Sequence, residues 1–150
     1  MERYNLNLRN KNISFINPYV CGRQSCMPGH TNKGIRRYWL MHYIVSGKGI
    51  FKAGGKTYDV SEGEMFIIRP DEMFVYQADT KAPWSYKWIG FSGEYAERLK
   101  DVKERVVKIP GYLFEDMQHA EDYGDMCEEY LALKVMELLC ELLGTEEKKS

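Results

Sequence analysis

The feature that most constrains the fold is a series of short apolar segments, rich in Ile, Val, Phe, Tyr and Trp, between Ile13 and Phe91. Glycine, proline and aspartate separate these segments at regular intervals, and this pattern predicts β-strands joined by tight turns. The clearest hairpin is GIFKA-GG-KTYDV, in which Gly54 and Gly55 can adopt the positive φ angles of a two-residue type I′ turn. Several short strands in succession favour a sandwich or a barrel.

After residue 92 the pattern becomes helical. Ser92 is suited to cap a first helix that ends at Pro110. The apolar residues of that helix, spaced by three or four, are Tyr95, Leu99, Val102 and Val106. A longer helix is expected from about Asp125, with Gly144 suited to its C-cap. The expected fold is therefore mainly β, a barrel over 1–92, followed by two or three α-helices over 93–150 of the same domain.

The last helix carries apolar residues on more than one face. A near-heptad row suited to helix pairing consists of Leu131, Val135, Leu138 and Leu142. A second row beside it consists of Leu133, Met136, Leu139 and Leu143. We predict that one face covers the barrel and that the first row forms a homodimer interface. In the alternative interpretation, a single wide face packs on the barrel and no partner is needed.

Length and composition exclude several classes of protein. The 150 residues suit one domain, and the 21 basic and 22 acidic residues nearly cancel, so the chain shows no electrostatic footprint for nucleic acid. The longest apolar runs are far shorter than the roughly 20 residues of a membrane span. No signal peptide is visible, and the four cysteines are too few and scattered for a disulfide framework. We expect a cytoplasmic protein with free thiols and no membrane contact.

The segment HYIVSGKGIFKAGGKTYDVSEGEMFIIRPDEMFVYQAD, followed by PWSYKWIGF, resembles the N-terminal effector-binding and dimerisation domain of AraC-type transcription regulators. The resemblance covers about 29–92 and rests on the SGKG turn, the glycine-tipped hairpin, the G-E-x-x-x-I-x-P step from Gly63 to Pro70 and the W-x-Y-x-W motif from Trp84 to Trp88. It implies a cupin-like jelly-roll barrel that binds a small effector, often a sugar, and a helix that pairs two subunits.

AraC-type regulators also carry a C-terminal domain with two helix-turn-helix motifs that enters the DNA major groove. Nothing after Gly144 can supply such a domain. We therefore expect this chain to be a fragment of a longer regulator rather than a free-standing relative, with DNA contacted only through the missing part.

Enzymatic cupins hold a divalent metal through an H-x-H motif, a following Glu and a later His. Here the H-x-H region reads Gly34-Ile35-Arg36, the Glu position falls near Leu40, and Phe74 occupies the position of the late His. No metal, cofactor or catalytic residue is therefore predicted, and the serines and glycines form no nucleophile elbow or phosphate loop. A stand-alone cupin enzyme acting on a sugar or small acid is the alternative function, and a purely structural dimerisation module is a third.

One stretch invites a separate metal hypothesis, because Cys21, Cys26 and His30 carry side chains that bind zinc. The spacing is loose, and a structural zinc site needs four ligands. A structural or pocket-edge role is favoured for these three residues.

Aromatic side chains are the main signal for a binding cavity, because sugars present flat C–H faces that stack on rings. Period-two alternation places Trp84, Tyr86 and Trp88 on one face of a strand. Under the resemblance, Tyr76, Tyr86 and Trp88 match effector-pocket positions, and His30 and Arg36 fall where relatives place polar contacts. The alternatives are ordinary core packing for the rings and a hydrogen-bonded core position for His42. The predicted ligand-binding residues are His30, Arg36, Tyr76, Trp84, Tyr86 and Trp88.

Overall fold

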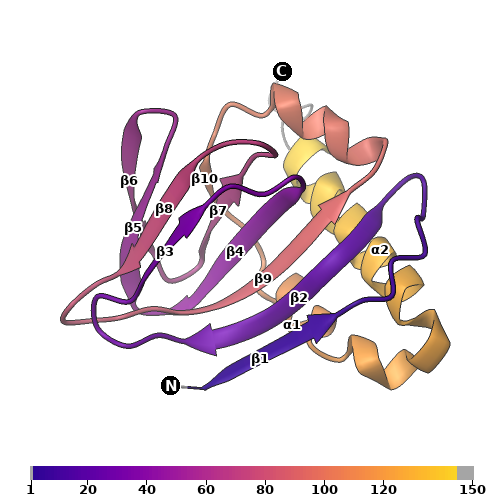
Figure 1. Cartoon of the computed structure of the whole chain (residues 1–150), viewed down its shortest axis with the longest axis horizontal. Helices are drawn as coiled ribbons and strands as arrows, with labels where there is room; N and C mark the ends of the chain where they lie inside the picture. The colour runs from indigo at the N-terminus through magenta and orange to yellow at the C-terminus, as the bar shows by residue number, and fades with distance from the viewer. Residues whose placement is uncertain (1, 145–150) are drawn as a thin grey trace.

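Two antiparallel sheets face each other in the computed structural model, which describes residues 2–144 (Figure 1). The larger sheet has the strand order β1-β2-β9-β4-β7-β10, and the smaller has the order β3-β8-β5-β6. The strands are β1 (Arg3–Asn7), β2 (Asn17–Ser25), β3 (Thr31–Gly34), β4 (Trp39–Ser46), β5 (Lys48–Ala53), β6 (Lys56–Ser61), β7 (Glu64–Ile68), β8 (Phe74–Ala78), β9 (Ser85–Ser92) and β10 (Val106–Lys108). This arrangement confirms the expected mainly β fold with helices after it.

The helical segments follow β9 and pack on the outer face of the larger sheet (Figure 1). They are the 3₁₀ segments η1 (Tyr95–Asp101) and η2 (Ala120–Met126), the α-helices α1 (Tyr112–Met117) and α2 (Cys127–Leu139), and a last π-helical turn, η3 (Cys140–Gly144). The strand β10 lies between η1 and α1 and pairs with β7, so the C-terminal part of the chain also contributes to the sheet.

The predicted glycine hairpin is confirmed. Gly54 and Gly55 have φ angles of 58° and 76°, and Ala53 pairs with Lys56 across the turn, as a two-residue type I′ connection requires. This turn fixes the register of β5 on β6, and β5 in turn pairs with β8 in the smaller sheet.

The first predicted helix is only partly correct. Ser92 is the last residue of β9 and not a helix cap, and the helical segment is the short η1, preceded by Glu94. Val106, predicted as a helical residue, begins β10 and pairs with Phe66. The strand pairing offered by the edge of β7 outweighed a local three-to-four periodicity, which is a weak signal in so short a segment.

Alternation along the strands of the larger sheet separates two cores. On β4, Trp39 and Met41 face the helices, whereas Leu40 and Ile44 face the smaller sheet. The other central strands, β7 and β9, divide in the same way. Both faces of this sheet are therefore buried, which explains why its strands are nearly continuous apolar runs.

The row predicted as a dimer interface lies inside the molecule, which corrects that prediction. Leu131, Val135 and Leu138 have no exposed surface, and Leu142 is 9% exposed; all four belong to the core between α2, η3 and the larger sheet. The sequence contains two apolar rows on one helix, and only the packing of that helix decides which row faces inward.

Candidate functional site

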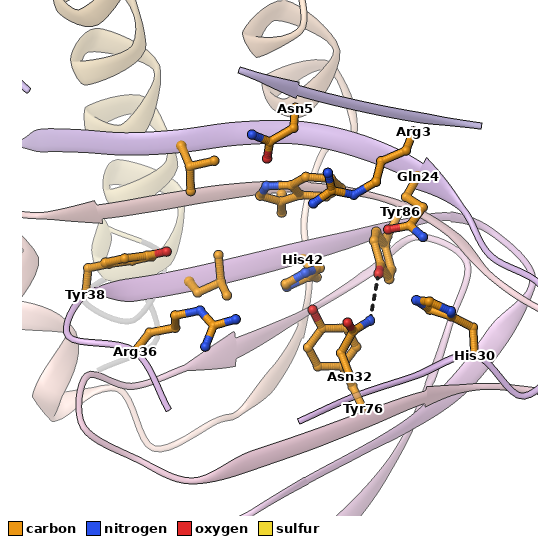
Figure 2. Close-up of a pocket in the computed structure, with 13 residues that line it drawn as sticks. Arg3, Asn5, Gln24, His30, Asn32, Arg36, Tyr38, His42, Tyr76 and Tyr86 are labelled. Atoms are coloured by element: carbon orange, nitrogen blue, oxygen red, sulfur yellow. Dashed lines mark hydrogen bonds between the residues drawn. The ribbon is translucent and has the colours of Figure 1, made fainter. Parts of the chain in front are cut away.

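A cavity of about 360 Å³ lies between the two sheets, beside the paired strands β1 and β2 (Figure 2). Its volume falls in the range of small-molecule sites, roughly 300–1,000 Å³. The lining residues come from β1, β2, β3, β4, β8, β9 and the two loops that flank β3. They are Arg3, Asn5, Val20, Gln24, His30, Asn32, Arg36, Tyr38, Leu40, His42, Tyr76, Tyr86 and Trp88.

Most of the residues predicted from the sequence meet in this cavity. His30, Arg36, Tyr76, Tyr86 and Trp88 all line it, although they come from separate strands and loops. Tyr86 and Trp88 alternate on β9 as expected, and Tyr86 lies 5.9 Å from Tyr76 of β8 between ring centroids. The aromatic face of β9 therefore points between the sheets.

Trp84 does not join them at the cavity wall. It precedes β9 and is fully buried. Its ring stacks on that of Phe66, with 5.6 Å between ring centroids, and the edge of the indole lies against Gly49. The structure places it in the core below the cavity, where the absence of a β-carbon on Gly49 makes room for the indole.

His42 lies at the centre of the cavity wall (Figure 2). Four aromatic rings surround it. The ring centroids of Phe66, Tyr76, Tyr86 and Trp88 are 4.8, 4.7, 4.7 and 6.0 Å away. The imidazole Nδ1 has no hydrogen-bond partner among residues 2–144, which corrects the interpretation of His42 as a hydrogen-bonded core residue. Burial, together with the charge of Arg36, lowers the pKa of His42 to about 3. The imidazole is therefore neutral at physiological pH.

Two tyrosines supply neutral hydroxyl groups beside His42. Burial raises the pKa of Tyr76 to about 12, and burial also raises the pKa of Tyr86. The Tyr86 hydroxyl accepts a hydrogen bond of 3.4 Å from the Asn32 side chain (Figure 2). Each phenol can both donate and accept a hydrogen bond to a bound molecule.

Two arginines contact aromatic rings at the cavity. The Arg3 guanidinium lies 5.3 Å from the ring centroid of Trp88, and the Arg36 guanidinium lies 5.5 Å from that of Phe74. Such cation–π contacts orient a guanidinium without consuming its N–H donors.

Sequence reasoning missed the contribution of the N-terminal strand. Arg3 and Asn5 lie two residues apart on β1 and both line the cavity, as do Gln24 on β2 and Asn32 on β3. The period-two spacing of Arg3 and Asn5 is compatible with a strand. Strands are recognised in a sequence by alternating apolar residues, however, and this strand is mostly polar.

The positions considered for metal binding lie apart. Cys21 belongs to the core under the helices and Cys26 to the core between the sheets, so the two thiols face opposite sides of the larger sheet. Leu40 lines the cavity and Phe74 is buried beside it. Within residues 2–144, no three His, Cys, Asp or Glu side chains gather where they could hold a metal ion. All four cysteines are free.

Comparison with known proteins identifies the family of this chain. The family described as the AraC-like ligand binding domain matches residues 17–141, and the chain belongs to that family. This assignment confirms the resemblance found in the sequence. Two curated regulators are similar: the raffinose operon transcriptional regulatory protein of Pediococcus pentosaceus is 32% identical over 85% of this chain, and the Msm operon regulatory protein of Streptococcus mutans is 39% identical over 52% of it.

The chain spans less than half the length of these relatives, 46% of the first and 28% of the second. Among solved structures, the protein YhaK of Escherichia coli aligns over 72% of this chain and 50% of its own with a TM-score of 0.57 and 14% identity, a likeness of fold alone. In residues 2–144, none of the helices has the length and apolar character needed to cross a membrane.

Proposed function

We propose that this chain is the effector-sensing part of a transcription regulator and that its effector is a small saccharide. The observation that carries this function is the cavity between the sheets, whose wall combines the rings of Tyr76, Tyr86 and Trp88 with the amides of Asn5 and Asn32. Rings can stack on the C–H face of a sugar while amides and phenols bind its hydroxyl groups. The relative that is 32% identical, the raffinose operon transcriptional regulatory protein, has a saccharide in its name, which supports the same class of effector.

A thermal-shift screen against mono- and oligosaccharides tests this function. A ligand that binds only the folded chain raises stability by RT ln(1 + [L]/Kd), which is roughly 2.7 kcal/mol at a hundredfold excess over Kd. The bound sugar should be recovered unchanged by NMR after prolonged incubation. Turnover of the sugar would instead support the alternative, a cupin enzyme.

Matched variants then locate the binding site. Trp88→Ala and Tyr86→Ala should weaken sugar binding by more than they lower the free energy of unfolding. Tyr43→Ala is the control, because Tyr43 lies on the opposite face of the larger sheet, where it stacks on Phe114 at 5.5 Å. That variant should lose stability and keep its affinity. If the two cavity variants unfold while the remaining folded fraction binds normally, the rings serve only the core.

We also propose that the domain forms a homodimer, through the outward face of η2 and α2 rather than the row predicted from the sequence. Met126 and Leu133 are 57% and 56% exposed, and Tyr123, 51% exposed, stacks on Tyr130 at 4.1 Å. Met126, Tyr130 and Leu133 follow each other at spacings of four and three, which suits pairing of two helices. An exposed apolar stripe of this kind marks a partner site.

Light scattering of Leu133→Glu tests the dimer, because a twofold interface would bring two introduced charges together. The variant should be a folded monomer. Met73→Glu is the control: Met73 is 80% exposed at the turn before β8, so the same change there should leave the dimer intact. A wild-type chain that remains monomeric at high concentration would refute this interface.

A further inference from the structure

The charge of the cavity differs from the charge of the chain. The whole sequence has 21 basic and 22 acidic residues, yet the cavity wall, as far as residues 2–144 form it, includes Arg3 and Arg36 and no aspartate or glutamate. The arginines come from distant parts of the sequence, one on β1 and one in the loop between β3 and β4. The fold thus gathers positive charge at this site from a nearly neutral chain.

In the part of the chain that the structure describes, neither guanidinium group has a counter-ion. Among residues 2–144, Arg3 and Arg36 form no ion pair, while other arginines of the chain do: Arg23 pairs with Glu2 and Arg105 with Glu72. Arg36 Nη1 donates to the carbonyl of Ile35 at 3.0 Å, a bond that occupies one of its five N–H donors. The remaining donors are available to a bound molecule.

The two arginines are directed at the same region. In Figure 2 their side chains extend from opposite sides of the site toward its middle, where Tyr76 and His42 lie. The positive charges of both arginines act on the Tyr76 hydroxyl, and that of Arg36 also acts on His42. An anion placed beside Tyr76 would therefore be attracted by both guanidinium groups and could accept a bond from the phenol.

The balance of donors and acceptors favours the same conclusion. The arginines only donate, and the side-chain acceptors of the wall are neutral amides, phenols and imidazoles. Each hydroxyl group of a neutral sugar also has an O–H donor, and among the described lining residues these donors would find neutral acceptors but no carboxylate. An acceptor-rich anionic group matches the surplus of donors and forms stronger, charge-assisted hydrogen bonds.

We propose that the effector is an anionic saccharide, whose carboxylate or phosphate group lies between Arg3 and Arg36 beside Tyr76 while its ring stacks on the aromatic wall. This inference rests on the proposed saccharide-sensing function and specifies the charge of the ligand.

Calorimetric and thermal-shift titrations of the intact chain with matched probes test it. The probes are glucose and galactose, the 6-phosphate and the uronic acid of each, and inorganic phosphate. We expect at least one anionic derivative to bind at least tenfold more tightly than its neutral parent and to lose affinity as salt is raised, because salt screens exposed charges. The phosphate and uronate arms distinguish the two sources of negative charge.

Charge-matched variants complete the test. Arg36→Gln should weaken binding of the anionic sugar roughly tenfold or more, the loss of a hydrogen bond to a charged group, with little effect on a neutral sugar. Arg36→Lys should retain part of the affinity. Arg37→Gln removes the same charge from the next residue, which is exposed and outside the cavity wall, and should change binding less than about twofold. Circular dichroism verifies that each variant is folded.

The outcomes distinguish the anionic effector from the proposed saccharide-sensing function on which it rests. Neutral sugars that bind as tightly as their acidic derivatives would overturn the anionic effector and leave saccharide sensing intact. Inorganic phosphate binding without any preference for a sugar derivative would overturn the saccharide part. If no member of the panel binds, the anionic saccharide is refuted, and a failed screen of neutral oligosaccharides would refute saccharide sensing as well.

Discussion

His42 should make the stability of this domain fall as the pH is lowered below neutrality. Its ring is 2% exposed, and its pKa in the folded chain is lowered to about 3, first by burial and then by the charge of Arg36. Facing it are Tyr76, which stays protonated over this range because its pKa is raised to about 12, Tyr86, whose pKa is also raised, and the uncharged rings of Phe66 and Trp88. In the unfolded chain the imidazole has its ordinary pKa of about 6.5.

The sign follows from proton binding. Below about pH 6.5 the unfolded chain binds a proton at His42 that the folded chain does not bind until about pH 3, so acid favours unfolding over this interval. The slope approaches about 1.4 kcal/mol per pH unit. At pH 5 the lost stability from this one group is therefore about 2 kcal/mol relative to pH 7.5.

Urea denaturation of the wild type and His42→Gln at pH 7.5 and pH 5 measures this effect. Glutamine keeps a neutral polar group at the position but cannot be protonated. The wild type should lose about 2 kcal/mol more than the variant between the two pH values, since all other titrating groups are common to both. Equal losses in the two proteins would show that His42 ionises in the folded chain with an ordinary pKa.

Three further variants test the packing that supports the site. Leu138→Glu should prevent folding, because Leu138 is fully buried in the chain's own core; a soluble, folded variant by circular dichroism would contradict that placement. Arg105→Met should lower the free energy of unfolding by about 3 kcal/mol in urea melts, since Arg105 donates to Glu72 and, at 3.1 and 2.8 Å, to the carbonyl of Ile67; an unchanged melt would refute a structural role for this pair. Gly22→Ala should cost about 2 kcal/mol and weaken ligand binding, because the added carbon would lie 2.5 Å from the Trp88 ring and would also clash with the Tyr4 carbonyl. Unaltered affinity would mean that Trp88 can move without consequence.

Local signals in the sequence were enough for the apolar strands and for the hairpin between β5 and β6. The Gly54-Gly55 turn requires two positive φ angles that residues other than glycine rarely adopt, so these two glycines were enough to predict the hairpin. Alternation on β9 likewise predicted that Tyr86 and Trp88 share a face. The segment after Ser92 could not be predicted so well, because a stretch such as Val106–Lys108 becomes a strand only when the edge of β7 is available to pair with it.

The candidate site shows the same division. His30, Arg36, Tyr76, Tyr86 and Trp88 were predicted for the ligand site through the family resemblance, and the structure brings them to one cavity wall. Trp84 shares the face of Tyr86, 5.9 Å away between ring centroids, but it does not line the cavity, and its ring fills the core against Gly49. Arg3 and Asn5 gave no apolar pattern, and their place at the cavity depends on the pairing of β1 with β2.

The sequence by itself determined the apolar strands, the turns between them and the family. Turns, alternation and motifs are properties of neighbouring residues, so they can be recognised without the fold. Only the tertiary structure decided which apolar row of the last helix is buried. Leu131, Val135 and Leu138 lie in the core, whereas Met126 and Leu133 are exposed, and the sequence alone does not distinguish the two sets. It also decided the charge of the cavity. Arg3 and Arg36 are 33 positions apart in the sequence numbering, and long-range strand pairing is what brings these two positive charges to one site.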